Sequence, residues 1–149
     1  STLQPSLRRT AHRIDVRVPP GIVLDSYPGP LEQILGNLVM NSLLHGFEHV
    51  PAGRIALEAE DAGDAVRLRY ADDGCGMDEE TAQQAFDPFF TTKLGRGGSG
   101  LGLYIVYNLA TAVLGGGITL HSRPGEGVDF LLTLPKTAPR LSEQKDEVV

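Results

Sequence analysis

The sequence predicts an α+β domain, a two-layer α/β sandwich whose mixed, mostly antiparallel sheet is covered on one face by about three helices. One observation is that two pairs of strand-like segments are each joined by a short turn. Another is a strongly periodic helix between the first strand and the first pair. The chain also has too few strand-helix-strand crossovers for a parallel sheet. Its 149 residues suit a single domain.

Alternation of apolar and polar residues predicts five strands. Pro19-Pro20-Gly21 breaks the first of them, and turn formers at 61–64 and 123–127 separate the members of each pair. We expect strands at 13–18, 54–60, 66–70, 118–122 and 128–134.

Three helices are predicted between these strands. The first begins near Leu31 after a proline-rich turn, ends near Gly46, and has an apolar face formed by Leu31, Ile34, Leu35, Leu38, Val39 and Ser42. Acidic residues from Asp78 favour the start of a short helix that reaches about Ala85. A third helix runs from about Leu101 to Leu114.

The ends of the chain differ in composition from its centre. Residues 12–135 carry the periodic segments, whereas 136–149 are polar and charged with too little apolar content to repay ordering. We therefore expect a domain over 12–135, a lead-in at 1–11 and a frayed tail at 136–149.

Composition excludes several classes of function. The 13 basic and 19 acidic residues give a net charge of −6, the wrong sign for a nucleic-acid or anionic-membrane surface over the whole domain. The single cysteine, Cys75, can form neither an intramolecular disulfide nor a cysteine-based zinc site, which favours a reducing compartment. No run approaches the roughly 18 apolar residues of a membrane span, and no signal sequence is visible.

The first helix carries a polar stripe beside its apolar face. Gln33, Asn37, Asn41 and His45 are spaced four apart and project from one side. Asparagine is a mediocre helix former, so two of them here need a reason. One interpretation is a solvated face; the other is that amide oxygens point into a cleft and hold a hard cation such as Mg²⁺. The helix alone does not decide.

A second polar cluster directly follows the strand at 66–70. Asp72-Asp73-Gly74-Cys75-Gly76 puts a carboxylate at a strand end, where it can accept a hydrogen bond from an exocyclic amine such as that of adenine. Gly74 and Gly76 let backbone approach a flat ring. A calcium loop is disfavoured, because the alternating oxygen ligands and final glutamate are missing.

A glycine-rich loop precedes the third helix. Residues 95–100 spell G-x-G-x-x-G, but a hairpin precedes them and no acid follows at the spacing of a dinucleotide fold. The surviving expectation is a phosphate site at the helix N-terminus, with Lys93 and Arg96 supplying positive charge. Phe86 is expected to pack in the core, and Phe89-Phe90 to form a hinge.

In this order, the segments resemble the ATP-binding catalytic domain of sensor histidine kinases, within the superfamily of DNA gyrase B, Hsp90 and MutL. Residues 35–42 (LGNLVMNS) look like the asparagine box and 72–76 (DDGCG) like the first glycine box. Residues 86–93 (FDPFFTTK) look like the phenylalanine box, 98–103 (GSGLGL) like the second glycine box, and 116–135 like the terminal hairpin. The resemblance spans about residues 25–135 and implies the Bergerat ATP-binding fold.

The resemblance also implies roles for individual residues. Asn41 would ligate Mg²⁺ on the ATP phosphates with Asn37 beside it, and Asp72 would accept from the adenine amine. His45 would reach phosphate, although a surface histidine at a helix end is the alternative. The catalytic residues would be Asn37, Asn41 and His45. The ATP site would comprise these with Asp72, Gly74, Gly76, Phe89, Lys93, Arg96, Gly98, Ser99, Gly100, Leu101 and Gly102, and residues 86–100 would form the lid.

At some positions this chain differs from members of the family that it resembles or from the wider superfamily. Asn37 stands where gyrase-like members carry a glutamate base, which favours transfer to a protein histidine over hydrolysis. Leu44 occupies a position that is often basic, and Val128 follows Gly127 where threonine is common. None of the four histidines has the setting of a phosphoacceptor.

The predicted function is therefore that of a catalytic fragment of a two-component kinase. It would bind Mg-ATP and pass the γ-phosphoryl group to a histidine on a separate dimerisation domain, with a response regulator downstream. Residues 1–11 would lead in from that dimerisation region. We expect a monomeric, cytoplasmic fragment of a homodimeric kinase, with no nucleic-acid or direct membrane contact; membrane anchoring of the full-length protein is left open. The alternatives are a nucleotide-binding regulatory module without phosphotransfer and an anti-sigma-type serine kinase.

Overall fold

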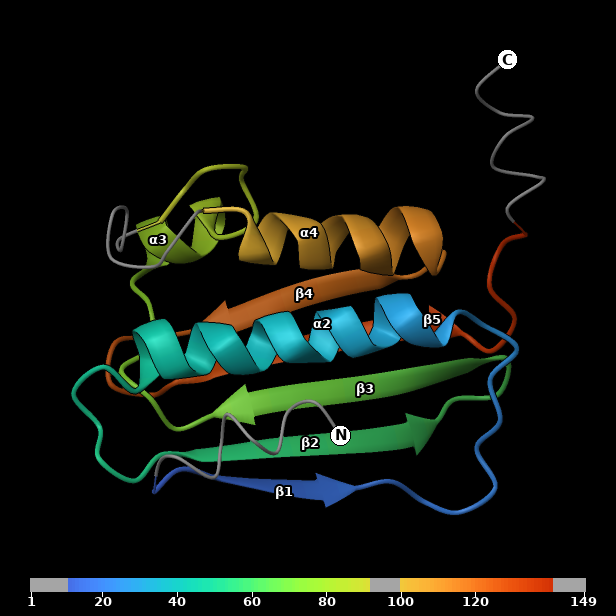
Figure 1. Cartoon of the computed structure of the whole chain (residues 1–149), viewed down its shortest axis with the longest axis horizontal. Coiled ribbons are helices and arrows are strands. Elements are labelled where there is room, and N and C mark those ends of the chain that lie inside the picture. The colour runs from blue at the N-terminus through green and yellow to red at the C-terminus, as the bar shows by residue number, and fades with distance from the viewer. Residues whose placement is uncertain (1–10, 92–99, 141–149) are drawn as a thin grey trace.

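The computed structural model describes residues 11–91 and 100–140 and contains a five-stranded sheet in the order β1-β2-β3-β5-β4 (Figure 1). Among the described residues, β1 pairs with β2 in parallel, and the other three strand pairings of the sheet are antiparallel. The strands are β1 (Arg13–Arg17), β2 (Arg54–Asp61), β3 (Ala65–Asp72), β4 (Gly117–Ser122) and β5 (Val128–Pro135). The predicted fold class is confirmed.

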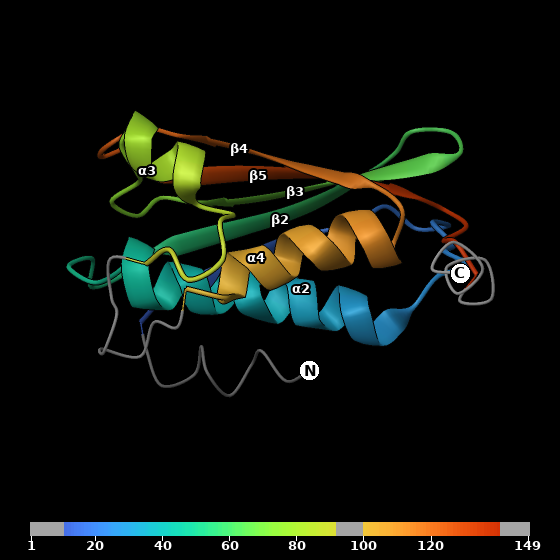
Figure 2. The ribbon, with the colours of Figure 1, turned by 90° about the horizontal axis from the view of Figure 1, so that it is seen from above.

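The helices lie mainly on one side of this sheet. In Figure 2, α2 (Pro28–Asn41) and α4 (Gly102–Asn108) run side by side below the strands, while the short α3 (Glu79–Gln84) contacts β4. Each long helix ends in a π-helical turn, η1 (Ser42–Gly46) after α2 and η2 (Leu109–Val113) after α4. The first helix begins three residues before Leu31 because Pro28 and Pro30 fit its first turn.

The core fills the space between the helices and the inner face of the sheet. Tyr70 of β3 and Phe130 of β5 are 1% and 0% exposed, and their ring centroids lie 6.2 Å apart. Opposite them, α2 buries Ile34 and Leu38 completely. Fully burying a large apolar side chain contributes about 1.5–3 kcal/mol, so these contacts hold α2 against β3.

Strand parity fixes which side chains of β3 face the helices. Val66, Leu68 and Tyr70 are buried, whereas Arg67 and Arg69 are exposed on the opposite face. Because successive side chains alternate, Asp72 points toward the helices, as Tyr70 does. This places a carboxylate at the edge of the core.

The structure differs from the expected frayed tail at residues 136–140. Residues 136–140 were predicted to begin a frayed tail, but Ala138 is buried and its N–H donates to the carbonyl of Asp25 at 2.9 Å. The hydroxyl of Tyr27 donates to the carbonyl of Pro139 at 2.6 Å. Paired backbone groups repay the ordering of this polar stretch, so ordered structure extends past residue 135. Residues 141–149 lie outside the described residues.

Candidate nucleotide-binding site

A cleft of about 400 Å³ opens between the C-terminal half of α2 and the chain that links β3 to α4. Six of the residues expected in the site line it: Asn37, Asn41, His45, Gly76, Gly100 and Gly102. Gln33, the first member of the polar stripe, is exposed and does not line the cleft. The last three members of the stripe therefore face a cleft, and their role in holding a cation stays a prediction.

Asn37 joins the two walls of the cleft. Its amide Nδ2 donates to the carbonyl of Gly102 at 3.1 Å, so α2 is tied to the first residue of α4. This bond leaves the amide oxygen of Asn37 as an acceptor. Asn41, one turn further along α2, also faces the cleft.

Asp72 lies at the end of β3 and is only 7% exposed. Its Oδ1 accepts from the backbone N–H of Gly74 at 3.0 Å and from that of Val128 at 3.2 Å. Its Oδ2 accepts from the hydroxyl of Ser42 at 2.6 Å. Hydrogen bonds from neutral donors compensate the burial of this carboxylate and fix its orientation.

Glycines allow the backbone to close around this carboxylate. A Cβ on Gly46 would lie 2.9 Å from Asp72 Oδ2, and one on Gly74 would lie 2.5 Å from the carbonyl oxygen of Gly46. Gly127 has a φ of +69°, and a Cβ there would meet the carbonyl oxygen of Asp72 at 1.9 Å. Side chains at positions 46 and 127 would collide with Asp72, and one at position 74 would collide with the backbone of Gly46, which explains why glycine stands at these positions.

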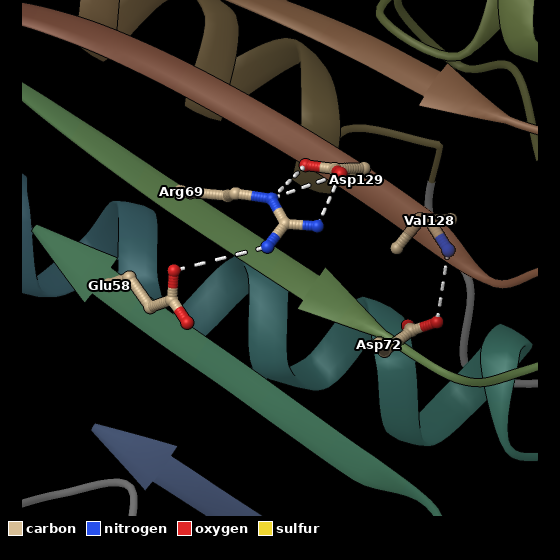
Figure 3. Close-up of polar contacts among 5 residues, drawn as sticks. All are labelled: Glu58, Arg69, Asp72, Val128 and Asp129. Atoms are coloured by element: carbon tan, nitrogen blue, oxygen red, sulfur yellow. Dashed lines mark hydrogen bonds and ion pairs between the residues drawn. The ribbon is translucent and has the colours of Figure 1, made fainter. Parts of the chain in front are cut away.

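Figure 3 shows how β5 approaches Asp72. The hydrogen bond to Asp72 comes from the backbone N–H of Val128, whose side chain is buried. This bond therefore does not require the hydroxyl that a threonine at position 128 would carry. The neighbouring Asp129 accepts a bidentate pair of bonds from Arg69, which also lies 3.9 Å from Glu58. The hydrogen bonds to Asp129 raise the pKa of Arg69. These charges tie β2, β3 and β5 together on the sheet's outer face.

The base of the glycine-rich loop is closed by one backbone bond. The N–H of Phe89 donates to the carbonyl of Gly100 at 2.7 Å, and Phe89 has a φ of 66°, a conformation rare outside glycine. Its ring is 71% exposed and does not line the cleft, which corrects its placement in the site. Phe90, the next residue, does line it. Phe86 packs against Phe130, as expected.

The remaining expected residues divide into two groups. Lys93, Arg96, Gly98 and Ser99 lie outside the described residues. Asp72, Gly74 and Leu101 are described but do not line the cleft; the first two are buried.

Sequence reasoning missed several lining residues. Met40, Leu44 and Glu48 follow Asn37, Asn41 and His45 at a spacing of three, a signal that was available in the helical periodicity. The others that were missed are Cys75, Met77, Asp78, Thr81, Ala85 and Leu103; Phe90 and Thr91 also line the cleft, but they belong to the expected lid at 86–100.

The described wall of the cleft has few positive charges. Its lining residues include Glu48 and Asp78 but no lysine or arginine. The carboxylate of Asp78 accepts from the N–H of Thr81 at 2.8 Å, which lowers the pKa of Asp78. An anionic ligand would therefore need backbone N–H groups, a metal ion or the lysine and arginine of the adjoining loop.

The donor set fits magnesium bound together with phosphates. Among the described residues, no cluster of three histidine, cysteine, aspartate or glutamate side chains could hold a metal ion. Mg²⁺ is typically bound by one or two protein oxygens, waters and substrate phosphates, which an asparagine at the cleft wall can satisfy.

Comparisons with known proteins agree with this geometry. The family described as histidine kinase-, DNA gyrase B-, and HSP90-like ATPases matches residues 27–138. Sensor histidine kinase ZraS of Klebsiella oxytoca is 38% identical over 121 residues, covering 80% of this chain and 24% of ZraS. The alginate biosynthesis sensor protein KinB of Pseudomonas aeruginosa is 34% identical over 105 residues, covering 70% of this chain and 17% of KinB.

Solved structures show the same fold. The nucleotide-free catalytic domain of histidine kinase ThkA superposes with a TM-score of 0.77 at 28% identity, covering 91% of this chain and 88% of that domain. Full-length ShkA in complex with AMPPNP gives a TM-score of 0.70 at 28% identity, covering 93% of this chain and 28% of ShkA. This chain therefore belongs to the histidine kinase-, DNA gyrase B-, and HSP90-like ATPase family.

The chain spans 17% to 24% of the length of these curated relatives. In residues 11–91 and 100–140, no helix combines the length and apolar character needed to cross a membrane.

Proposed function

We propose that this domain binds Mg-ATP in the cleft and delivers the γ-phosphoryl group to a histidine on a separate dimerisation domain. The observation that carries the proposal is the cleft itself. Asn37, Asn41 and His45 form one wall, and the glycine segment that begins at the buried, hydrogen-bonded Asp72 forms the other.

The adenine base would lie at the Asp72 end of the cleft. Asp72 Oδ2 retains acceptor capacity beyond its bond from Ser42, and adenine presents an amino group as a donor. Gly76 lines the cleft, and Gly74 lies against the backbone of Gly46, where a Cβ would not fit. The base would thus be recognised by one carboxylate and a flat backbone surface.

The phosphates would lie along α2 toward α4. The amide oxygen of Asn41 would hold Mg²⁺, with Asn37 beside it, and the ion would neutralise phosphate charge when bound. His45 would contact phosphate from the next turn. Lys93, Arg96 and the 98–102 segment would complete the phosphate site and, with residues 86–100, form the lid.

The transfer would break the bond between the γ-phosphorus and the β,γ-bridging oxygen and form a bond to an imidazole nitrogen, releasing ADP. Asn37 cannot act as a general base, so positioning and charge neutralisation would supply most of the catalysis. The acceptor histidine, the homodimer contacts and a response regulator would belong to other parts of the kinase system. We further propose a cytoplasmic location and a monomeric state for the isolated domain.

Calorimetric titration of ADP and ATP, with and without Mg²⁺, tests the binding step. We expect micromolar-range binding that Asp72→Asn weakens by a factor of roughly 10 to 150 and that changes its Mg²⁺ dependence in Asn41→Asp. Gln33→Ala is the matched control, because Gln33 shares the stripe but lies outside the cleft. If the folded wild-type domain binds neither nucleotide, the proposal fails.

A second assay separates kinase activity from the alternatives. The domain is mixed with a dimerisation domain of a related kinase, and the phosphorylated product is tested for acid lability. An acid-labile phosphohistidine supports the proposal. Nucleotide binding without transfer to any histidine domain would favour a regulatory module, and an acid-stable phosphoserine would favour a serine kinase.

A further inference from the structure

Three polar side chains meet in the core behind the cleft. The hydroxyl oxygen of Ser42 lies 2.6 Å from Asp72 Oδ2 and 2.6 Å from the hydroxyl oxygen of Tyr70. The Tyr70 hydroxyl also lies 3.1 Å from the carbonyl oxygen of Leu38. Ser42 and Tyr70 are 0% and 1% exposed, so water does not replace these bonds.

Ser42 and Tyr70 each have one hydroxyl proton, which fixes the direction of these hydrogen bonds. Asp72 in its ionised form can only accept, so the single proton of Ser42 points to Asp72. The Ser42 oxygen must then accept from Tyr70, because two oxygens 2.6 Å apart need a proton between them. Burial raises the pKa of Tyr70, which keeps that proton in place. The polarity runs from Tyr70 through Ser42 to the carboxylate.

Tyr70 also blocks an alternative state of Ser42. A serine in a helix can rotate its hydroxyl to the carbonyl four residues back, and for Ser42 that carbonyl belongs to Leu38. Tyr70 contacts this carbonyl and donates to the Ser42 oxygen. Without Tyr70, Ser42 would be able to turn away from Asp72.

We propose that Ser42 and Tyr70 are positioning residues that hold Asp72 as an acceptor in a single orientation, and so set the preference of the cleft for a base with an exocyclic amino group. The proposal rests on the proposed role of Asp72 in binding the base. Ser42 and Tyr70 are 0% and 1% exposed and are linked by hydrogen bonds to Asp72, so they would act on the base through Asp72. A carboxylate fixed by Gly74, Val128 and Ser42 rejects a carbonyl oxygen at the same position, because two acceptors would face each other.

The test measures the ratio of affinities for ADP and inosine diphosphate, whose base carries an oxygen in place of the amino group. Calorimetry on the wild-type domain is expected to favour ADP. We expect Ser42→Ala to lower this ratio about tenfold, the loss of roughly one bond to a charged group, and Tyr70→Phe to lower it about threefold. The double variant should match Ser42→Ala alone, because Tyr70 acts through Ser42.

A control separates positioning from loss of stability. Val66→Ala truncates a buried side chain at the far end of the same strand and should lower the melting temperature without changing the ratio. Tyr70→Phe keeps the ring in the core, so it provides a folded variant even where Ser42→Ala does not fold.

The outcomes are distinguishable. If Asp72→Asn changes the ratio while Ser42→Ala and Tyr70→Phe leave it within about twofold of wild type, the positioning roles are refuted and the nucleotide site stands. If Asp72→Asn leaves the ratio unchanged, or the wild type does not bind ADP, the proposed site and the positioning roles fall together.

Discussion

Replacing Asp72 by asparagine should weaken nucleotide binding strongly while changing the stability of the domain only slightly. The carboxylate of Asp72 accepts from Gly74 and Val128 at one oxygen and from Ser42 at the other. In Asp72→Asn, the amide oxygen can keep the two backbone bonds. The amide nitrogen then faces the Ser42 hydroxyl as a donor, so Ser42 must accept a hydrogen bond at this position instead of donating one.

The buried hydroxyls of Ser42 and Tyr70 can reorient their protons to accommodate this change. Ser42 can turn its proton to Tyr70, and Tyr70 can give its own proton to the carbonyl of Leu38, which is already 3.1 Å away. Every polar group then keeps a partner. We therefore expect the free energy of unfolding of Asp72→Asn to fall by about 1 kcal/mol or less.

Nucleotide binding should respond much more strongly. The variant presents N–H groups to the amino group of the base, and loss of a bond to a charged acceptor corresponds to about 1.5–3 kcal/mol, a factor of roughly 10 to 150 in Kd for ADP. Inosine diphosphate, which offers an acceptor, should gain affinity. Calorimetry with both nucleotides and urea unfolding measure the two effects.

Asp72→Leu is the matched comparison. It leaves the N–H groups of Gly74 and Val128 and the hydroxyl of Ser42 without the acceptor they share, and we expect it to cost about 3 kcal/mol or more in stability. Equal destabilisation of Asp72→Asn and Asp72→Leu, or wild-type affinity of Asp72→Asn for ADP, would contradict the predicted role of Asp72.

Three further predictions concern the surroundings of the site. Gly100→Ala introduces a Cβ at a φ of +76°, within 2.3 Å of facing backbone, and should cost about 1–3 kcal/mol in urea unfolding, whereas Gly102→Ala meets no atom within 4 Å and should cost nothing. Arg69→Ala breaks the surface pair with Asp129 and should cost at most about 1 kcal/mol; a loss that does not shrink in 1 M salt would contradict this. Asp78→Ala should lower the urea midpoint at pH 7. Because the folded pKa of Asp78 lies below its ordinary 3.8, the difference should fade as pH falls through that lowered value, and persistence in acid would show another cause.

The fold class and the order of the elements followed from the sequence alone, because alternation with a period of two and helical repeats are local properties. Spacing also placed Asn37, Asn41 and His45 on one side of a helix, but it left open whether that side faces solvent or a cleft, and the structure places it at a cleft. The exposed Phe89 ring was misplaced because its positive φ depends on the bond to Gly100 across the loop base.

The surroundings of Asp72 depend on contacts between segments that are far apart in the chain. Ser42 lies 28 residues from Tyr70 and 30 from Asp72 in the chain, and their contact depends on how α2 packs against β3. That register is set by the buried side chains of both elements, and no local pattern encodes it. The ordering of residues 136–140 has the same origin, because their partners, Asp25 and Tyr27, lie more than 100 residues earlier. Periodicity fixes which face a side chain occupies, whereas packing between distant segments fixes which atoms it meets.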